Sequence, residues 1–238
     1  MRGAALLLWL AAALPLAAQP ACRQALALGL DVSGSVDAGE YRLQLDGLAA
    51  ALLHPDVRRA LLAMPGRPVR IAVFEWSGAQ NQRVILPWTA IDGAEALEGA
   101  AARLHATRRH ASSRTTGIGA ALLAGGALLG AQADCPKRTL DLSGDGISNS
   151  GPRPRDTRHA PALEGIVVNG LVIGNAAAGD GPAGATGLSR LSAYYEAEVI
   201  RGPGAFVETA LGYADYEAAM VRKLLRELEG MSLSRLDQ

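Results

Sequence analysis

Runs of apolar residues that match the length of a β-strand alternate with helical patterns along this chain, and this alternation limits the folds that are open to it. The strand-like runs are ALALGLD (25–31), VRIAVFEW (69–76), TLDLSG (139–144) and GIVVNGLVIG (165–174). The first and fourth are almost continuously apolar, which is typical of parallel strands covered on both faces. Helical patterns occupy 38–53, 55–64, 92–105, 116–130 and 215–229. The alternation predicts a single α/β domain, doubly wound and Rossmann-like, with a mostly parallel central sheet and helices on both faces.

Three further segments complete the expected sheet and its connections. QRVILPW (82–88) follows the second run after a connection short enough for only an antiparallel hairpin, so we expect an edge strand, where Pro87 is tolerated. AFVETA (205–210) is a candidate for a last edge strand. The glycine- and alanine-rich stretch 175–188 is expected to be one long flexible loop.

At the start of the first predicted helix, Asp37 and Glu40 have the spacing of a capping box.

The composition fits one folded domain and excludes some partners. The chain has 238 residues, of which 49% are hydrophobic, and this is enough to bury a full core. Lysine plus arginine equals aspartate plus glutamate, at 23 each, so no overall charge favours nucleic acid or an anionic membrane. Recognition of a partner must therefore depend on a local site.

The first residues have the pattern of a secretory signal. Arg2 precedes a short apolar stretch that ends in Pro15 and small residues. The alternative, a transmembrane anchor, needs about 20 apolar residues, and this run is interrupted too early. We expect residues 1–21 to be a signal peptide and 22–238 to form the mature domain. The protein would then be exported, periplasmic or secreted, with no stable membrane span after cleavage.

Export affects the interpretation of the two cysteines. Cys22 and Cys135 are the only pair, and a lone pair in an oxidising compartment usually forms a disulfide. Cys22 lies nine residues before Asp31, and Cys135 lies ten before Asp145. If the two segments form neighbouring parallel strands, the sulfur atoms meet at the starting ends of those strands.

Polar residues gather where the apolar runs end. DVSGS places Asp31, Ser33 and Ser35 after the first run, and Asp145 follows the third. Hydroxyl residues of 112–122 stand at the start of a helix. Ligands of doubly wound domains bind beyond the carboxyl ends of the strands, so we expect these groups to meet there. Carboxylate and hydroxyl oxygens suit a hard cation, namely Mg²⁺, Mn²⁺ or Ca²⁺.

These motifs resemble the von Willebrand factor type A (vWA) domain and its metal-ion-dependent adhesion site (MIDAS). The features that carry the likeness are DVSGS, then TGIGAAL from Thr116, then the aspartate-glycine pair at Asp145. More narrowly, the chain resembles a group of exported bacterial vWA-like proteins of unknown function. The resemblance implies a metal site formed by Asp31, Ser33, Ser35, Thr116 and Asp145. Thr115 is an alternative to Thr116, and SGDG stands where many members of the family have TDG.

The resemblance also implies a binding module, since the family's ion leaves a position for a carboxylate from a protein or peptide partner. An enzyme is not expected, because a nucleophile elbow and a Walker loop are both missing from the sequence. Two alternatives stay open, namely a metal-dependent hydrolase and a structural envelope protein with a vestigial metal site. The run HATRRHASSR (105–114) is either a basic rim beside the ion or a solvated helix end.

Overall fold

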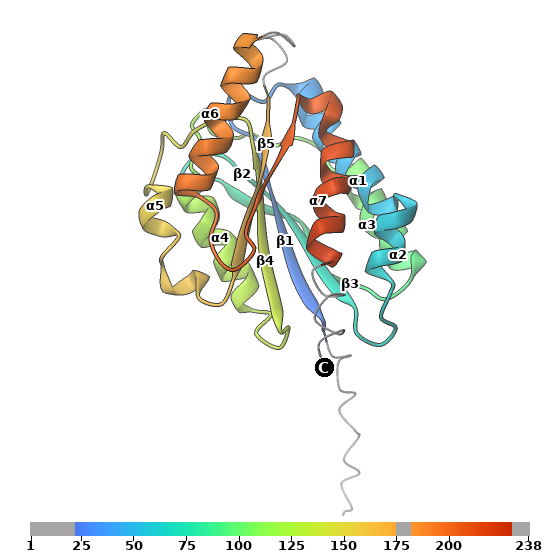
Figure 1. The fold of residues 1–238 in the computed structure, drawn as a ribbon. Helices are drawn as coiled ribbons and strands as arrows, with labels where there is room; N and C mark the ends of the chain where they lie inside the picture. The colour runs from blue at the N-terminus through green and yellow to red at the C-terminus, as the bar shows by residue number, and fades with distance from the viewer. Residues whose placement is uncertain (1–21, 175–181, 230–238) are drawn as a thin grey trace, which may run out of the picture.

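The computed structural model describes residues 22–174 and 182–229, which fold around one six-stranded sheet (Figure 1). The strands are β1 (Gln24–Asp31), β2 (Val69–Trp76), β3 (Gln82–Ile91), β4 (Lys137–Gly144), β5 (Val167–Ile173) and β6 (Val207–Ala210). Their order is β3-β2-β1-β4-β5-β6, and every pair is parallel except β2 with β3. The predicted fold class is therefore confirmed, and so are the antiparallel hairpin and the last edge strand.

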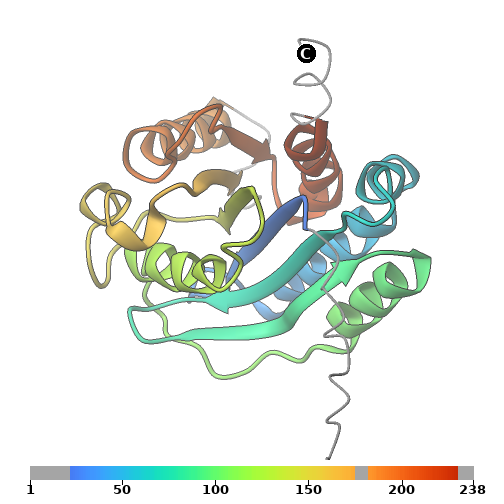
Figure 2. The same cartoon turned by 90° about the horizontal axis from the view of Figure 1, so that it is seen from below.

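Helices cover both faces of the sheet. They are α1 (Ala38–Leu53), α2 (Pro55–Leu61), α3 (Ala94–Ala106), α4 (Ile118–Gly130), α5 (Pro154–Thr157), α6 (Pro182–Glu198) and α7 (Tyr216–Glu229). In Figure 2, α4, α5 and α6 lie on one side of the sheet and α1, α2, α3 and α7 lie on the other. Two short 3-10 helices, Pro161–Leu163 and Tyr213–Asp215, complete the described elements.

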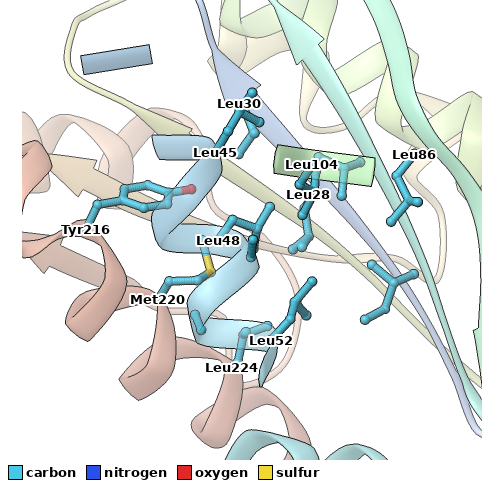
Figure 3. Packing of buried hydrophobic residues seen from close by; sticks show 14 of the residues in the cluster. Leu28, Leu30, Leu45, Leu48, Leu52, Leu86, Leu104, Tyr216, Met220 and Leu224 are labelled. Atoms are coloured by element: carbon cyan, nitrogen blue, oxygen red, sulfur yellow. The ribbon is translucent and has the colours of Figure 1, made fainter. Parts of the chain in front are cut away.

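The larger core fills the space between the sheet and the layer formed by α1, α2, α3 and α7 (Figure 3). Leu28 and Leu30 of β1 point to the same face because side chains alternate along a strand. They contact the layer formed by α1, whose Leu45, Leu48 and Leu52 are fully buried. Each such leucine stabilises the fold by roughly 1.5–3 kcal/mol. This packing holds β1 and α1 rigidly on either side of the DVSGS loop.

The start of α1 is set by local hydrogen bonds. The Glu40 amide donates to Asp37 Oδ1 at 2.8 Å, and the Asp37 amide donates to Glu40 Oε2 at 2.8 Å. The predicted capping box is thus present, and it satisfies two amide groups that a helix start leaves unpaired. Its consequence is that α1 begins three residues after Ser35 and restrains the loop before it.

The predicted loop over 175–188 is wrong in its second half. From Pro182 the chain is helical through Glu198, and this helix was not predicted from the sequence; residues 175–181 lie outside the described residues. Glycine, serine and threonine weaken the intrinsic helix signal of this stretch, but Leu188, Leu191 and Tyr195 pack α6 onto the sheet. Tertiary packing therefore overrides the local composition.

The predicted disulfide is present at the amino ends of two neighbouring strands. Cys22 precedes β1 and Cys135 precedes β4, and their Cα atoms are 4.9 Å apart. β1 and β4 pair in parallel from Gln24 opposite Lys137, so the bond ties the starts of the two strands together. The expected signal peptide, 1–21, lies outside the described residues. Within the two described ranges, none of the helices combines the length and hydropathy needed to cross a bilayer.

Candidate metal centre

The candidate centre lies at the carboxyl ends of β1 and β4, where the winding of the sheet reverses. The chain passes from β1 to β2 on one side, whereas β4, β5 and β6 extend the sheet on the other. Asp31 is the last residue of β1, and Asp145 follows β4 directly. Thr116 stands two residues before α4 and is brought to the same edge. Doubly wound domains bind their ligands at this kind of position.

The five residues predicted from the sequence are brought together by a continuous chain of hydrogen bonds. The Ser33 amide donates to Asp31 Oδ1 at 2.8 Å, and Thr116 Oγ1 donates to Ser33 Oγ at 3.3 Å. The hydroxyl groups of Ser33 and Ser35 are 3.3 Å apart. Ser35 Oγ in turn donates to Asp145 Oδ1 at 2.7 Å. Three segments that are distant in the sequence therefore place five oxygen-bearing side chains at one rim.

Of the two adjacent threonines, Thr116 is the one that faces the centre. Its side chain is 6% exposed and contacts Ser33, as described above. Thr115 is exposed, and its hydroxyl lies 2.9 Å from Ser113 Oγ in the preceding loop. The geometry thus favours Thr116 among the two candidates that the sequence left open.

Asp31 is the most unusual group of the centre. It is fully buried, and its Oδ2 atom has no hydrogen-bond partner among the described residues. Burial raises the pKa of the Asp31 carboxyl to about 7, with a further contribution from the nearby Asp145 charge, while the Ser33 amide acts in the opposite direction. A buried carboxylate oxygen without a donor, beside a second carboxylate, is an environment that a cation would stabilise.

The remaining donors fit a hard cation. Asp31, Ser33 and Thr116 are buried, Asp145 is half-buried and Ser35 is exposed, so the cluster opens to solvent on one side. Within residues 22–174 and 182–229 there is no group of three or more histidine, cysteine, aspartate or glutamate residues that could hold a metal ion. A metal here would therefore depend on hydroxyl oxygens as well as two carboxylates, which is a donor set suited to Mg²⁺ and similar ions.

Sequence reasoning did not identify the residues that support these groups. Gln44 of α1 is fully buried and donates to the Asp31 carbonyl at 3.0 Å. Asn149 Oδ1 accepts a hydrogen bond of 2.8 Å from the Thr116 backbone amide, and the Asn149 backbone amide donates to the Thr116 carbonyl at 2.8 Å. A polar residue on the buried face of α1 is a signal that could have indicated Gln44, whereas the sequence carries no comparable signal for Asn149.

The arginine-rich segment after α3 lies against the DVSGS loop. Because α3 ends at Ala106, this segment is a loop and not the end of a helix. The Gly34 amide donates to the Arg114 carbonyl at 3.2 Å, and Arg109 Nη2 donates to the Val36 carbonyl at 2.7 Å. The guanidinium carbon of Arg109 also lies 5.6 Å from the centre of the Tyr41 ring. The loop thus brings positive charge to the edge of the centre.

Comparison with known proteins places the chain in a sequence family. A family model described as "Protein of unknown function (DUF1194)" matches residues 21–232. Among curated proteins, none matches the chain.

Several solved structures share the fold. Proximal thread matrix protein 1 from the mussel byssus, with a zinc-occupied MIDAS motif, is 19% identical with a TM-score of 0.57, over 87% of this chain and 48% of that one. The pilus adhesin SpaC from Lactobacillus rhamnosus GG, in an open conformation, is 16% identical with a TM-score of 0.58, over 88% and 30%. The von Willebrand factor type A protein from Catenulispora acidiphila is 15% identical with a TM-score of 0.55, over 87% and 42%. The chain thus spans about half the length, or less, of these structures, and at these identities the likeness concerns the fold.

Proposed function

The chain belongs to the family described as protein of unknown function DUF1194 and has the fold of a vWA domain, and we propose that it is an exported binding module that recognises an acidic group of a protein partner through a divalent cation. The observation that carries this proposal is the convergence of Asp31, Ser33, Ser35, Thr116 and Asp145 at one rim, with Asp31 Oδ2 buried and unpartnered within the described structure.

The five residues would divide the work of holding the ion. The hydroxyl groups of Ser33, Ser35 and Thr116 offer neutral oxygen atoms, and the carboxylates of Asp31 and Asp145 offer the negative charge. Because the cluster opens to solvent at Ser35 and Asp145, a coordination position of the ion would remain accessible to a carboxylate from outside. Mg²⁺ is the ion we propose, with Mn²⁺ and Ca²⁺ in the same class of hard cations.

The surroundings of the rim also favour an acidic partner. Arg108 and Arg114 are exposed on the loop whose Arg114 carbonyl accepts a hydrogen bond from the Gly34 amide, next to the centre. Such charges raise the rate of encounter with an acidic surface, and their effect falls as salt screens them. Ile147, two residues after Asp145, is 59% exposed and offers an apolar contact next to the ion. A partner with an acidic side chain beside an apolar one would match this surface.

Binding is favoured over hydrolysis by the groups that contact the centre. Among the described residues, the hydrogen-bond partners of the five are serine, threonine, glutamine and asparagine side chains, the two aspartates and backbone groups. A hydrolase needs a general base within hydrogen-bond reach of an attacking water. Among the described residues these partners include no histidine or glutamate, and the two aspartates are the groups that would hold the ion, so we propose a binding role.

Two adjacent threonines allow a matched test of this function. We expect Mg²⁺ or Mn²⁺ to raise the melting temperature of the wild-type protein and of Thr115→Ala, but not of Thr116→Ala. Partners captured from a cell-envelope extract by the wild type should be lost in chelator and lost with Thr116→Ala. Metal-independent melting of the wild type would contradict the proposal and favour a vestigial site. Turnover of phosphoester substrates that depends on Asp31 would favour a hydrolase.

Export is tested separately. The proposal rests on the sequence of residues 1–21 and is supported by the disulfide, since such bonds persist mainly in oxidising compartments. Expression of the full chain in a bacterial host should yield a periplasmic or secreted protein whose first residue lies near Cys22. Recovery of the uncleaved chain in the cytoplasm would contradict export.

A further inference from the structure

Tyr195 of α6 brings a second unpartnered oxygen close to Asp31. The Tyr195 side chain is fully buried, and its hydroxyl has no hydrogen-bond partner among the described residues. Asp31 Oδ2 is likewise buried and has no hydrogen-bond partner among the described residues. Buried polar atoms in folded proteins are nearly always paired, so two unpaired atoms in one place indicate that each has a role which the protein alone does not complete.

Two glycines open the path that Tyr195 takes across the sheet. A Cβ atom on Gly170 of β5 would lie 2.7 Å from Tyr195 Cδ1, so the ring needs a glycine there. A Cβ atom on Gly144 of β4 would lie 2.5 Å from Tyr195 Oη and 3.2 Å from Asp31 Oδ2. The two oxygens therefore flank one position, which only the absence of a side chain at Gly144 keeps open. Gly144 is also the first glycine of the SGDG motif, which stands where many vWA domains have TDG.

We propose that Tyr195 is a positioning residue of the metal centre, whose hydroxyl donates to Asp31 Oδ2, directly or through one water, and holds the ionised carboxylate in the orientation that the cation requires. This inference rests on the proposed function. Partners of this kind orient a metal ligand and typically change metal affinity by about 10- to 100-fold. The phenol remains a donor at any working pH, because burial, followed by the Asp31 charge, raises its pKa well above the ordinary value.

The neighbouring tyrosine links the same helix to the other side of the centre. Tyr194 Oη accepts a hydrogen bond of 3.2 Å from the Ser148 amide, in the loop that follows Asp145. The rings of Tyr194 and Tyr195 lie edge to face, with centroids 6.1 Å apart. Consecutive residues of α6 therefore support the Asp31 side and the Asp145 side of the centre together.

The test compares two buried tyrosines by Mn²⁺ titration calorimetry. Tyr195→Phe should weaken Mn²⁺ binding about tenfold. In chelator it should be about as stable as the wild type, because the hydroxyl has no partner among the described residues and its bond to Asp31 would form only when the ion holds the carboxylate in place. The control is Tyr216→Phe, which deletes another fully buried hydroxyl, 3.2 Å from Ser143 Oγ. This control should lose stability in chelator and keep the wild-type affinity for Mn²⁺.

Gly144→Ala is a second variant that perturbs the same pair of oxygens while Tyr195 is retained. The added methyl group would displace the Tyr195 hydroxyl and crowd Asp31 Oδ2, so we expect a loss of Mn²⁺ affinity at least as large as that of Tyr195→Phe. Wild-type affinity in Tyr195→Phe, or a loss of stability in chelator without a loss of affinity, would overturn the inference and leave a packing role. If the wild-type protein itself bound no Mn²⁺, the proposed function would fail, and this outcome is distinct from a failure of the Tyr195 inference alone.

Discussion

Ser35 Oγ donates a hydrogen bond of 2.7 Å to Asp145 Oδ1, and this bond joins the ends of β1 and β4 across 110 positions of sequence. Both residues lie on the more exposed side of the centre. The bond gives Ser35 a defined orientation toward Asp145, so that both oxygens are already turned to the same rim.

Replacement of Ser35 therefore has separable effects on stability and on metal binding. Ser35→Ala should lower the free energy of unfolding by no more than about 1 kcal/mol, since the lost hydrogen bond is exposed to water. It should weaken Mn²⁺ binding about tenfold or more, because a donor oxygen and the restraint on Asp145 are lost together. Chemical denaturation and Mn²⁺ titration measure the two quantities. Ser189→Ala, on the outside of α6, is the control and should change neither.

The pH dependence of stability should change when metal is added. The pKa of folded Asp31 is about 7, above the ordinary aspartate value of 3.8, so between these pH values the folded state binds a proton that the unfolded state has released. In chelator, the stabilising contribution of Asp31 is fully present below about pH 4 and is lost as the pH rises through about 7. Mg²⁺ binds the ionised form, so it should raise the melting temperature more at pH 8 than at pH 6.

Asp31→Asn is the control for that titration. The amide does not ionise, so the variant should lose both this part of the pH dependence and the response to Mg²⁺. Melting curves at several pH values, with and without chelator, show whether stability falls or rises with pH. A wild-type protein whose stability in chelator rises between pH 5 and pH 8 to the same extent as that of Asp31→Asn would contradict the assignment.

A buried ion pair connects α7 to the sheet. Lys223 Nζ lies 2.8 Å from Asp141 Oδ1 and 2.9 Å from Glu227 Oε1, and all three side chains are almost completely buried. Burial opposes the ammonium charge, but the carboxylates of Asp141 and Glu227 outweigh it and raise the pKa of Lys223. Lys223→Met would leave two carboxylates without their cation, so it should destabilise the fold by about 3–5 kcal/mol.

The matched control for Lys223 lies one residue earlier on the same helix. Arg222 Nε pairs with Glu208 at 3.1 Å, but the Arg222 side chain is half exposed. Arg222→Met should therefore change the free energy of unfolding by less than about 1 kcal/mol. Urea denaturation measures the free energy of unfolding of both variants. Equal losses of stability would contradict the prediction that the buried ion pair contributes more than the exposed one.

The disulfide should stabilise the fold without affecting the centre. The bond between Cys22 and Cys135 closes a loop of 113 residues at the amino ends of β1 and β4, whereas the centre lies at their carboxyl ends. Cys22→Ser with Cys135→Ser should lower the free energy of unfolding by about 2–4 kcal/mol. Mn²⁺ affinity of the folded double variant should stay within about twofold of the wild type, and a larger loss would show that the two ends of the strands are coupled.

The parts of this molecule that were predictable from sequence are those with local signals. The capping box of Asp37 and Glu40 marks the start of α1, and the buried strands have long apolar runs, so the sheet and most of its helices follow. The meeting of Ser35 and Asp145 was also predictable, because parallel strands bring their carboxyl ends to one edge of a sheet, whereas Thr116 was indicated by the resemblance of TGIGAAL to the vWA motif.

The parts that were not predictable depend on contacts between distant residues. Helix α6 is rich in small residues and has few apolar side chains, so its stability depends on packing against the sheet and not on its own sequence. Gln44 and Tyr195 face Asp31 from two different layers, α1 on one side of the sheet and α6 on the other. No spacing in the sequence relates either residue to Asp31, so their place at the centre is visible only in the folded chain.

Anomalous diffraction from a crystal of the protein soaked in Mn²⁺ would show directly whether a cation binds at the centre. We expect a peak at the carboxyl ends of β1 and β4, about 2.0–2.6 Å from oxygen atoms of Ser33, Ser35 and Thr116 or of the two aspartates. The absence of a peak there under saturating Mn²⁺, or a peak only at unrelated surface carboxylates, would contradict the proposed metal centre.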